Sequence, residues 1–234
     1  MVTLVTQRGA REGYEAVIVP TTAEGRGATV FRWSASRPSR RAVLHLADLS
    51  DSLISAEVAI WYTERGIRFY LADLDPRMSL AGTGRRQARP VGDALRQLGL
   101  ACAHLRAAEG ISEIILSASG TDCVTAALWC ASESATTATA GALILTDPVF
   151  GRSAPSGLDI SCPVLVISGT GPARATKARR RIGLGAHVTW LNLAAGGHAF
   201  QERWPTAPDP GRQFFRELGR WLGAYMYGRD DRLL

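Results

Sequence analysis

The chain has 234 residues and is 46% hydrophobic but only 7% aromatic, so it can bury one sizeable core, and a single domain spanning residues 1–234 is expected. No apolar run approaches the about 20 residues of a membrane-spanning helix, and the first residues form no basic-then-apolar signal peptide, which favours a cytoplasmic protein with no membrane partner. The net charge of +6 is unevenly distributed, because one basic stretch, Pro172–Arg181, concentrates five positive charges in ten residues. A basic stretch of this kind can bind nucleic acid or anionic lipid.

Alternating apolar runs and helical patterns fill most of the chain. The runs predict strands at Glu15–Pro20, Thr29–Ala35, Ala42–Ala47, Arg68–Leu74, Glu113–Ser117, Ala142–Thr146, Pro163–Ser168 and His187–Leu193. From the third onward most are continuous aliphatic stretches, as expected for parallel strands covered on both faces. The helical patterns lie at Ser52–Arg65, Val91–Glu109, Thr121–Ala131, Pro172–Ile182 and Gly211–Tyr225. This order predicts an α/β fold, with an eight-stranded, mostly parallel sheet flanked by helices and an antiparallel edge made by the opening strands.

Two connecting segments bear on access to a ligand site. Val149–Cys162 has 14 residues, which leaves little room for a lid domain. Met78–Pro90 is a polar loop beside the place where a pocket should open. We therefore expect an open pocket, or one covered by that loop or by a second copy of the chain in a homodimer.

The basic stretch and the cysteines both have an ordinary structural interpretation. No aromatic-interleaved basic motif or zinc spacing accompanies Pro172–Arg181, so we expect an exposed helix face and no nucleic-acid partner. Lys177 is the only lysine, and this arginine- and alanine-rich composition is typical of a high-GC bacterial genome. The cysteines lie in apolar stretches without paired metal spacing, which predicts buried reduced thiols at Cys102, Cys123, Cys130 and Cys162.

Six pieces of the sequence together resemble a bacterial subgroup of α/β hydrolases, the serine esterase and lipase-like enzymes, over nearly the whole chain. "RAVLHLADLSDS" is similar to the third strand and oxyanion loop of that family, and "TERGIRFYLADL" to its helix and fourth strand. "IILSASGTDCVTAALW" is similar to the nucleophile turn, "GALILTDP" and "CPVLVISG" to the sixth and seventh strands, and "GGHAF" to the histidine turn. The resemblance implies an α/β-hydrolase fold, in which a Gly-x-Ser-x-Gly turn presents the nucleophile.

The departures from that family fall on the catalytic residues. Ala47 and Asp48 stand where the oxyanion loop of the family carries His-Gly, and Gly120 takes the serine position when the "TAALW" helix is aligned. The acid of these enzymes usually follows the seventh strand, but no Asp or Glu occurs from Ile160 to Gln201. His198 stands where the catalytic histidine of the family is expected.

The corner after the fifth strand has two candidate residues. Ser119 would be a displaced nucleophile, and its neighbours two positions away, Ser117 and Thr121, are tolerably small. Gly120 keeps the register of the following helix, and it takes φ > 0 freely, where serine costs ~1–3 kcal/mol. We predict that Gly120 occupies the positive-φ corner.

Two carboxylates are candidates to act with His198. Asp147 ends the sixth strand, so Ser119, Asp147 and His198 stand in the chain order of a catalytic triad; the alternative is a turn residue before Pro148. Asp48 replaces a glycine that lines the oxyanion hole in the family, and its charge would oppose a developing oxyanion. Beside His198 it would instead suit a general acid or base, the alternative being a cap of the next helix.

Three functions remain open. The first is cofactor-free acid–base chemistry, an elimination, isomerisation or cyclisation on a small apolar metabolite, with His198 and Asp48 as catalytic residues. The second is an esterase or thioesterase that uses Ser119, His198 and Asp147, and the third is a catalytically silent binding protein. Expected substrate-binding residues are Ala47, Leu49, Gly120, Thr121 and Phe150. The remaining histidines are expected to be structural: His45, His104 and His187. No metal is expected.

Overall fold

The computed structural model describes residues 14–19, 28–33, 38–46, 56–74, 90–132, 140–151, 154–168, 178, 180–182, 187–192 and 210–230. These residues form an eight-stranded sheet in the order β1-β2-β4-β3-β5-β6-β7-β8. The strand bounds are β1 Tyr14–Val19, β2 Ala28–Trp33, β3 Arg41–Leu46, β4 Arg68–Asp73, β5 Glu113–Ser119, β6 Ala142–Thr146, β7 Val164–Ser168 and β8 Val188–Asn192. β2 runs antiparallel to β1 and β4, and all other pairs are parallel. The predicted parallel sheet with an antiparallel edge is confirmed.

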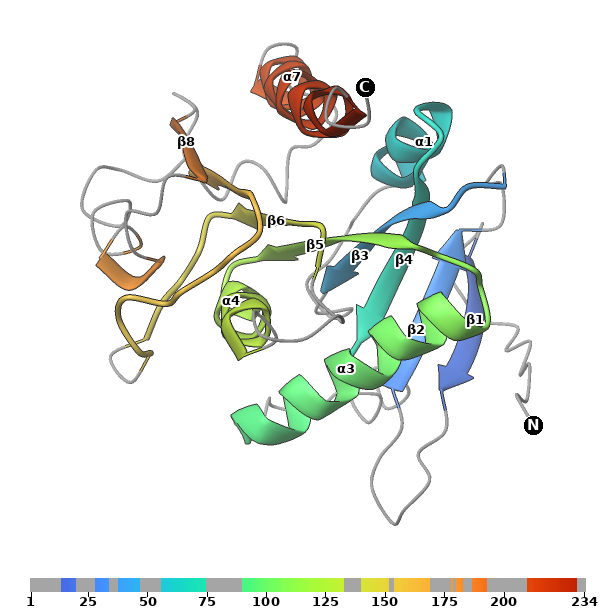
Figure 1. Cartoon of the computed structure of the whole chain (residues 1–234), viewed down its shortest axis with the longest axis horizontal. Helices are drawn as coiled ribbons and strands as arrows, with labels where there is room; N and C mark the ends of the chain where they lie inside the picture. The colour runs from blue at the N-terminus through green and yellow to red at the C-terminus, as the bar shows by residue number, and fades with distance from the viewer. Residues whose placement is uncertain are drawn as a thin grey trace.

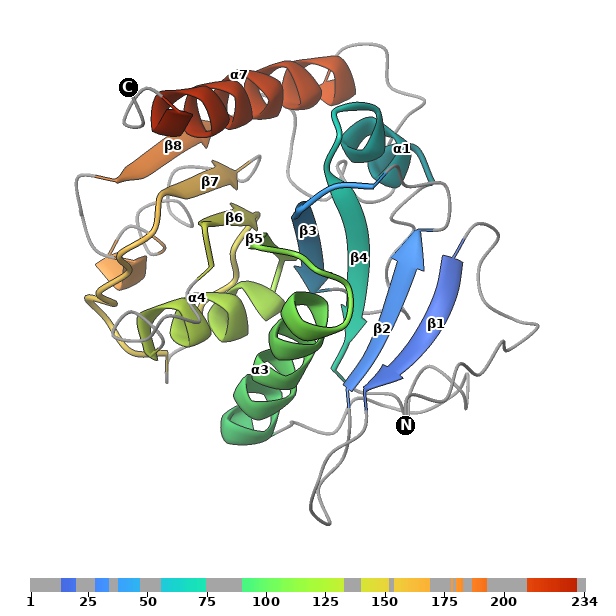
Figure 2. The ribbon, with the colours of Figure 1, turned by 45° about the vertical axis from the view of Figure 1, so that its right-hand side comes forward.

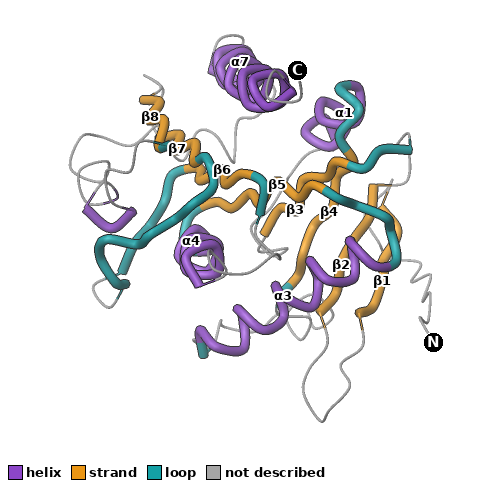
Figure 3. Tube along the Cα trace, viewed as in Figure 1, coloured by secondary structure: helices purple, strands orange, loops and turns teal. Residues whose placement is uncertain are grey.

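Helices cover both faces of the sheet. α1 (Ala56–Glu64) and α7 (Pro210–Asp230) lie on one face, and α3 (Val91–Ala107) and α4 (Asp122–Ser132) lie on the other (Figures 1 and 2). Figure 3 shows the strands as the layer between these helices. No helix within the described ranges is long and apolar enough to cross a membrane.

Side-chain alternation divides the core into two layers. In β3 and β5, Leu44 and Leu116 belong to the cluster that contains residues of α3 and α4, whereas Val43 and Ile115 belong to the cluster with α1 and α7. Successive side chains of a strand point to opposite faces. Strands covered on both faces therefore need apolar residues at nearly every position, which explains their continuous aliphatic sequences.

Part of the basic stretch is described. Ala178 and residues 180–182 are helical; Ala178 and Ile182 are buried, and Arg180 is exposed. This arrangement agrees with a helix that has one apolar face, and the rest of Pro172–Arg181 lies outside the described residues.

The end of α7 is attached to the amino ends of two central strands. The Tyr225 hydroxyl donates a hydrogen bond to Glu113 Oε1 at 2.5 Å, and Arg41 Nε donates to Glu113 Oε2 at 2.8 Å. Gly141 lies against this group, and a Cβ atom there would collide with the Tyr225 hydroxyl. A larger residue at this position would therefore have to displace the Tyr225 hydroxyl.

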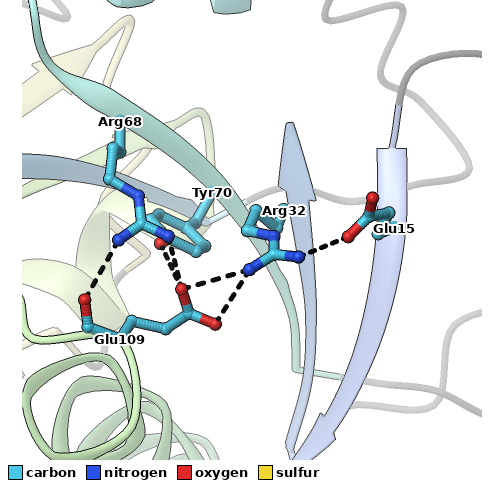
Figure 4. Close-up of polar contacts among 5 residues, drawn as sticks. All are labelled: Glu15, Arg32, Arg68, Tyr70 and Glu109. Atoms are coloured by element: carbon cyan, nitrogen blue, oxygen red, sulfur yellow. Dashed lines mark hydrogen bonds and ion pairs between the residues drawn. The ribbon is translucent and has the colours of Figure 1, made fainter. Parts of the chain in front are cut away.

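A second polar group lies at the same edge of the sheet, between α3 and the antiparallel strands (Figure 4). Glu109, just after α3, forms ion pairs with Arg68 of β4 and Arg32 of β2. Tyr70 donates a hydrogen bond to Glu109 Oε2 at 3.2 Å, and Arg32 also pairs with Glu15 of β1. One carboxylate thus connects α3 to β4 and β2, and through Arg32 to β1.

The charge of Glu109 is stabilised by its partners. Burial alone would raise the pKa of this carboxyl, but the hydrogen bond from Arg68 and the charges of Arg32 and Arg68 outweigh burial, so its pKa is lowered. A carboxylate whose pKa is lowered on folding contributes stability above its ordinary pKa and loses that contribution as the pH falls through the lowered value.

Replacing the Glu109 carboxylate by an amide should therefore destabilise the fold. The side chains of Arg68 and Glu109 are each 14% exposed, and removing one partner of such a pair leaves a poorly solvated charge. We expect Glu109→Gln to lower the free energy of unfolding by about 2 kcal/mol at neutral pH, measured by urea denaturation. Arg220→Gln is the control, because that side chain is 69% exposed; equal midpoints for the two variants would contradict the prediction.

Candidate active site

The carboxyl ends of β5, β6 and β7 are held together by backbone hydrogen bonds just beyond the strands. The amide of Gly120 donates to the Thr146 carbonyl at 3.0 Å, and the amide of Val149 donates to the Gly120 carbonyl at 2.8 Å. The amide of Asp147 donates to the Ile167 carbonyl at 2.8 Å. Both the amide and the carbonyl group of Gly120 therefore bind the turn after β6.

Gly120 takes the corner between β5 and α4. Its φ is +57°, a left-handed conformation that glycine adopts without steric cost. Ser119 is the last residue of β5, and α4 begins two residues after it, at Asp122. The prediction that Gly120 occupies the positive-φ corner is confirmed. The corner therefore presents no side chain.

Asp147 is the one non-glycine residue of the described ranges with a positive φ, +45°. Aspartate tolerates this region better than most residues but still at some cost, and such strain concentrates at functional sites. Because Ser119 lies opposite Thr146 in the pairing of β5 with β6, Asp147 follows the neighbouring strand end. The chain therefore brings Ser119 and Asp147 to adjacent positions at one edge.

Cys123 lies beneath the same corner and is not a nucleophile. It is fully buried, and its Sγ lies 3.4 Å from the Ala118 carbonyl oxygen and 3.6 Å from that of Thr146. Burial, with a further contribution from the negative charge of Asp122, raises the pKa of this thiol. A thiol that resists ionisation in an apolar site is inert. All four cysteines are buried and form no disulfide, as predicted.

Of the other predicted site residues, two are described by the structure. Thr121 is exposed beside Gly120, whereas Phe150 is 4% exposed and belongs to the core. The preceding residue, Val149, is instead exposed to solvent, at 42%. The following lie outside the described residues: Ala47, Asp48, Leu49 and His198. Within the described ranges, no three His, Cys, Asp or Glu side chains are arranged to hold a metal ion.

His45, predicted from the sequence to be structural, forms a polar pair near the carboxyl ends of β3 and β5. His45 of β3 lies opposite Ser117 of β5, and His45 Nδ1 is 3.0 Å from Ser117 Oγ. The imidazole stacks near Phe69, with ring centroids 6.4 Å apart. The residue as a whole is half-buried, but its Nε2 atom is shielded from solvent and has no hydrogen-bond partner in the described structure.

Burial lowers the pKa of His45 to about 4. The imidazole is therefore neutral at pH 7, and it is a poor general base, because a good one titrates near the working pH. The Ser117–His45 pair is thus not a hydrolytic dyad, although it contains the two residue types. Sequence reasoning missed this pair because no local pattern in either strand indicates a side-chain contact between residues 72 positions apart.

No family model and no curated protein matches this sequence. Among solved structures, the chain is similar to a dienelactone hydrolase from Anabaena variabilis, with a TM-score of 0.67 and 17% identity over 91% of this chain and 97% of that one. It is also similar to the Pyrococcus furiosus esterase Pf2001, with a TM-score of 0.62 and 14% identity over 97% and 98% of the chains. Est1E from Butyrivibrio proteoclasticus has a TM-score of 0.60 and 10% identity over 91% and 99%. The fold is that of the α/β-hydrolase superfamily.

The left-handed corner should make Gly120 sensitive to substitution even though space is available. A Cβ atom at Gly120 would meet nothing within 4 Å, so any cost of Gly120→Ala comes from φ alone. We expect the free energy of unfolding to fall by about 1–2 kcal/mol, measured by urea denaturation. Gly223→Ala is the matched control: its site is equally open but lies within α7, where alanine should stabilise by about 0.5–1 kcal/mol. Equal effects of the two substitutions would argue against a strained corner.

The buried imidazole of His45 should make stability depend on pH. Its folded pKa of about 4 lies below the unfolded value of about 6.5, so the unfolded state binds more protons between these values. Stability should be fully present above pH about 6.5 and decline by up to about 1.4 kcal/mol per pH unit towards pH 4. Denaturation of wild type and His45→Gln between pH 4 and about 6.5 isolates the pH-dependent contribution of His45 to the free energy of unfolding. The variant should lack this contribution. His187→Gln, at an exposed position, controls for the loss of a histidine; parallel curves for wild type and His45→Gln would refute the assignment.

Proposed function

We propose that the protein is an enzyme that moves protons on a small apolar substrate and forms no acyl-serine intermediate. The observation that supports this most directly is Gly120 at the corner with φ +57°. Acyl transfer by this type of site needs a hydroxyl at the turn, aimed at a histidine and at oxyanion donors. A glycine there provides no hydroxyl while it preserves the turn, the strand ends and the hydrogen bonds that shape the site.

In this proposal the chemistry belongs to the loops that follow β3 and β8. His198 is the general base that removes a proton from carbon, and Asp48 is the acid or base that returns a proton elsewhere on the substrate. A carboxylate in place of an oxyanion-loop glycine suits this role, because proton transfer does not require the hole that acyl transfer needs. The reaction class is an elimination, an isomerisation or a cyclisation, without a cofactor.

An esterase or thioesterase is the second candidate, and one specific observation favours it. Ser119 and Asp147 end adjacent strands, so a serine and an acid stand at one edge in the chain order of a triad with His198. The similarity to structures described as esterases and hydrolases agrees with this candidate. Against it, Ser119 lies one residue before the corner and continues the regular pleat of β5.

Ester hydrolysis separates the two candidates. We expect wild-type activity on short-chain p-nitrophenyl esters at neutral pH to stay close to the buffer rate, and Ser119→Ala to leave it unchanged. Gly120→Ser should restore little, since Asp48 would still oppose the oxyanion and loss of oxyanion stabilisation alone costs about 100- to 1000-fold. Rapid turnover by wild type, lost in both Ser119→Ala and His198→Ala, would establish the esterase and refute the proposal.

The proton-transfer activity has its own positive test. In D2O, the protein should accelerate exchange of the acidic C–H protons of at least one member of a panel of small ketones, esters and nitriles, followed by proton NMR. His198→Ala should abolish that exchange. A wild-type protein that neither exchanges these protons nor hydrolyses esters would be a silent binding protein.

A further inference from the structure

The Ser117–His45 pair lies one pleat below the corner on the side of the sheet that faces α1 and α7. His45 is the penultimate residue of β3, and Ser117 lies two residues before Ser119 in β5. Their flanking residues Val43 and Ile115 belong to the α1 and α7 cluster, so alternation places His45, Ser117 and Ser119 on this same face. The pair is therefore a polar feature at the carboxyl end of an otherwise aliphatic layer.

The hydrogen-bond inventory decides which nitrogen carries the proton. If Ser117 Oγ donates to His45 Nδ1, the proton sits on Nε2, and Nε2–H is the only donor of the pair that lacks an acceptor. If Nδ1–H donates instead, both the Ser117 hydroxyl proton and the Nε2 lone pair lack partners. Because each unmade hydrogen bond of a buried group destabilises the fold, the first arrangement is favoured. His45 then presents a buried N–H donor that has no acceptor among the described residues.

Buried donors of this kind nearly always have a partner, and an exception calls for a reason. An oxygen atom of a bound ligand would satisfy Nε2–H. The low pKa of His45, about 4, keeps the ring neutral at pH 7, so the donor carries no charge that would need a counterion. A neutral imidazole with a lowered pKa can polarise a carbonyl oxygen through its N–H without giving up that proton.

We propose that His45 Nε2–H binds the carbonyl oxygen of the substrate, so that the substrates are small apolar carbonyl compounds with a proton on the adjacent carbon. This inference rests on the proposed proton-transfer function. The base removes the α-proton, the C–H electron pair forms a carbon–carbon double bond, and the carbonyl π electrons move to oxygen. The resulting enolate oxygen keeps its hydrogen bond to Nε2–H, and the proton on the base returns to carbon to complete the reaction.

The direct test observes the donor itself, using the full-length protein with 15N-labelled histidine. We expect the His45 resonances to show the Nε2–H tautomer and to shift on addition of cyclohexanone. Methylenecyclohexane, which has the same shape without the oxygen, should not shift them. An Nδ1–H tautomer, no shift with cyclohexanone, or equal shifts with both compounds would overturn the inference. Ser117→Ala should weaken the tautomer preference in the same spectra.

Variants test the role in turnover. His45→Phe should lower the rate constant for α-proton exchange of cyclohexanone by about 100- to 1000-fold, the usual cost of one donor to a developing oxyanion. His45→Gln keeps an N–H donor at the right reach and should recover part of the rate. If His45→Phe does not fold, the His45→Gln variant and the 15N spectra still test whether His45 binds the carbonyl oxygen.

The matched control is His104→Phe. The Nε2 atom of His104 is also buried without a hydrogen-bond partner, but it lies on α3, on the opposite side of the sheet. Its loss should leave exchange unchanged, and an equal loss of rate in both variants would assign His45 a merely structural role. Failure of the two proposals is distinguishable: a ketone-dependent His45 shift without any exchange would refute only the proton-transfer function. Exchange without the shift would refute only the role of His45.

Discussion

The parallel pairing of β3, β5, β6 and β7 is the constraint on which the candidate site depends. It brings the carboxyl ends of strands distant in the chain to one edge, where backbone hydrogen bonds link the turn at Gly120 to the turn at Asp147. These four strands are mostly buried on both faces, so their register is set by packing as well as by hydrogen bonds. A site at this edge is therefore built on backbone that has little freedom to move.

The side-chain ion pairs and the candidate site lie at opposite ends of the parallel strands. Glu109 and Glu113 gather arginine and tyrosine partners at the amino ends of the parallel strands, whereas the positive-φ residues Gly120 and Asp147 lie at the carboxyl ends. The ion pairs of Glu109 hold the end of α3, and the hydrogen bond from Tyr225 to Glu113 holds α7, both away from the carboxyl ends of the strands.

The turn after β5 has a backbone conformation that suits the residue at its corner. A left-handed φ is costly for serine and free for glycine, so Gly120 adopts it without strain. Asp147 has a positive φ nearby, and the buried Nε2 atom of His45 has no hydrogen-bond partner among the described residues. Both features lie at or near the carboxyl ends of the strands, where the candidate site is proposed.

The sequence by itself determined the elements, their order and the residue at the corner. Continuous aliphatic runs predicted the parallel strands, and the preference of glycine for positive φ predicted Gly120, because burial on two faces and backbone sterics are local properties. Only the tertiary structure decided which strands are neighbours. His45 and Ser117 are 72 residues apart, and Asp147, whose φ is positive, donates its amide hydrogen bond to Ile167 of β7, 20 residues further along the chain. No local pattern encodes such contacts, since each exists only once the sheet has assembled in its final order.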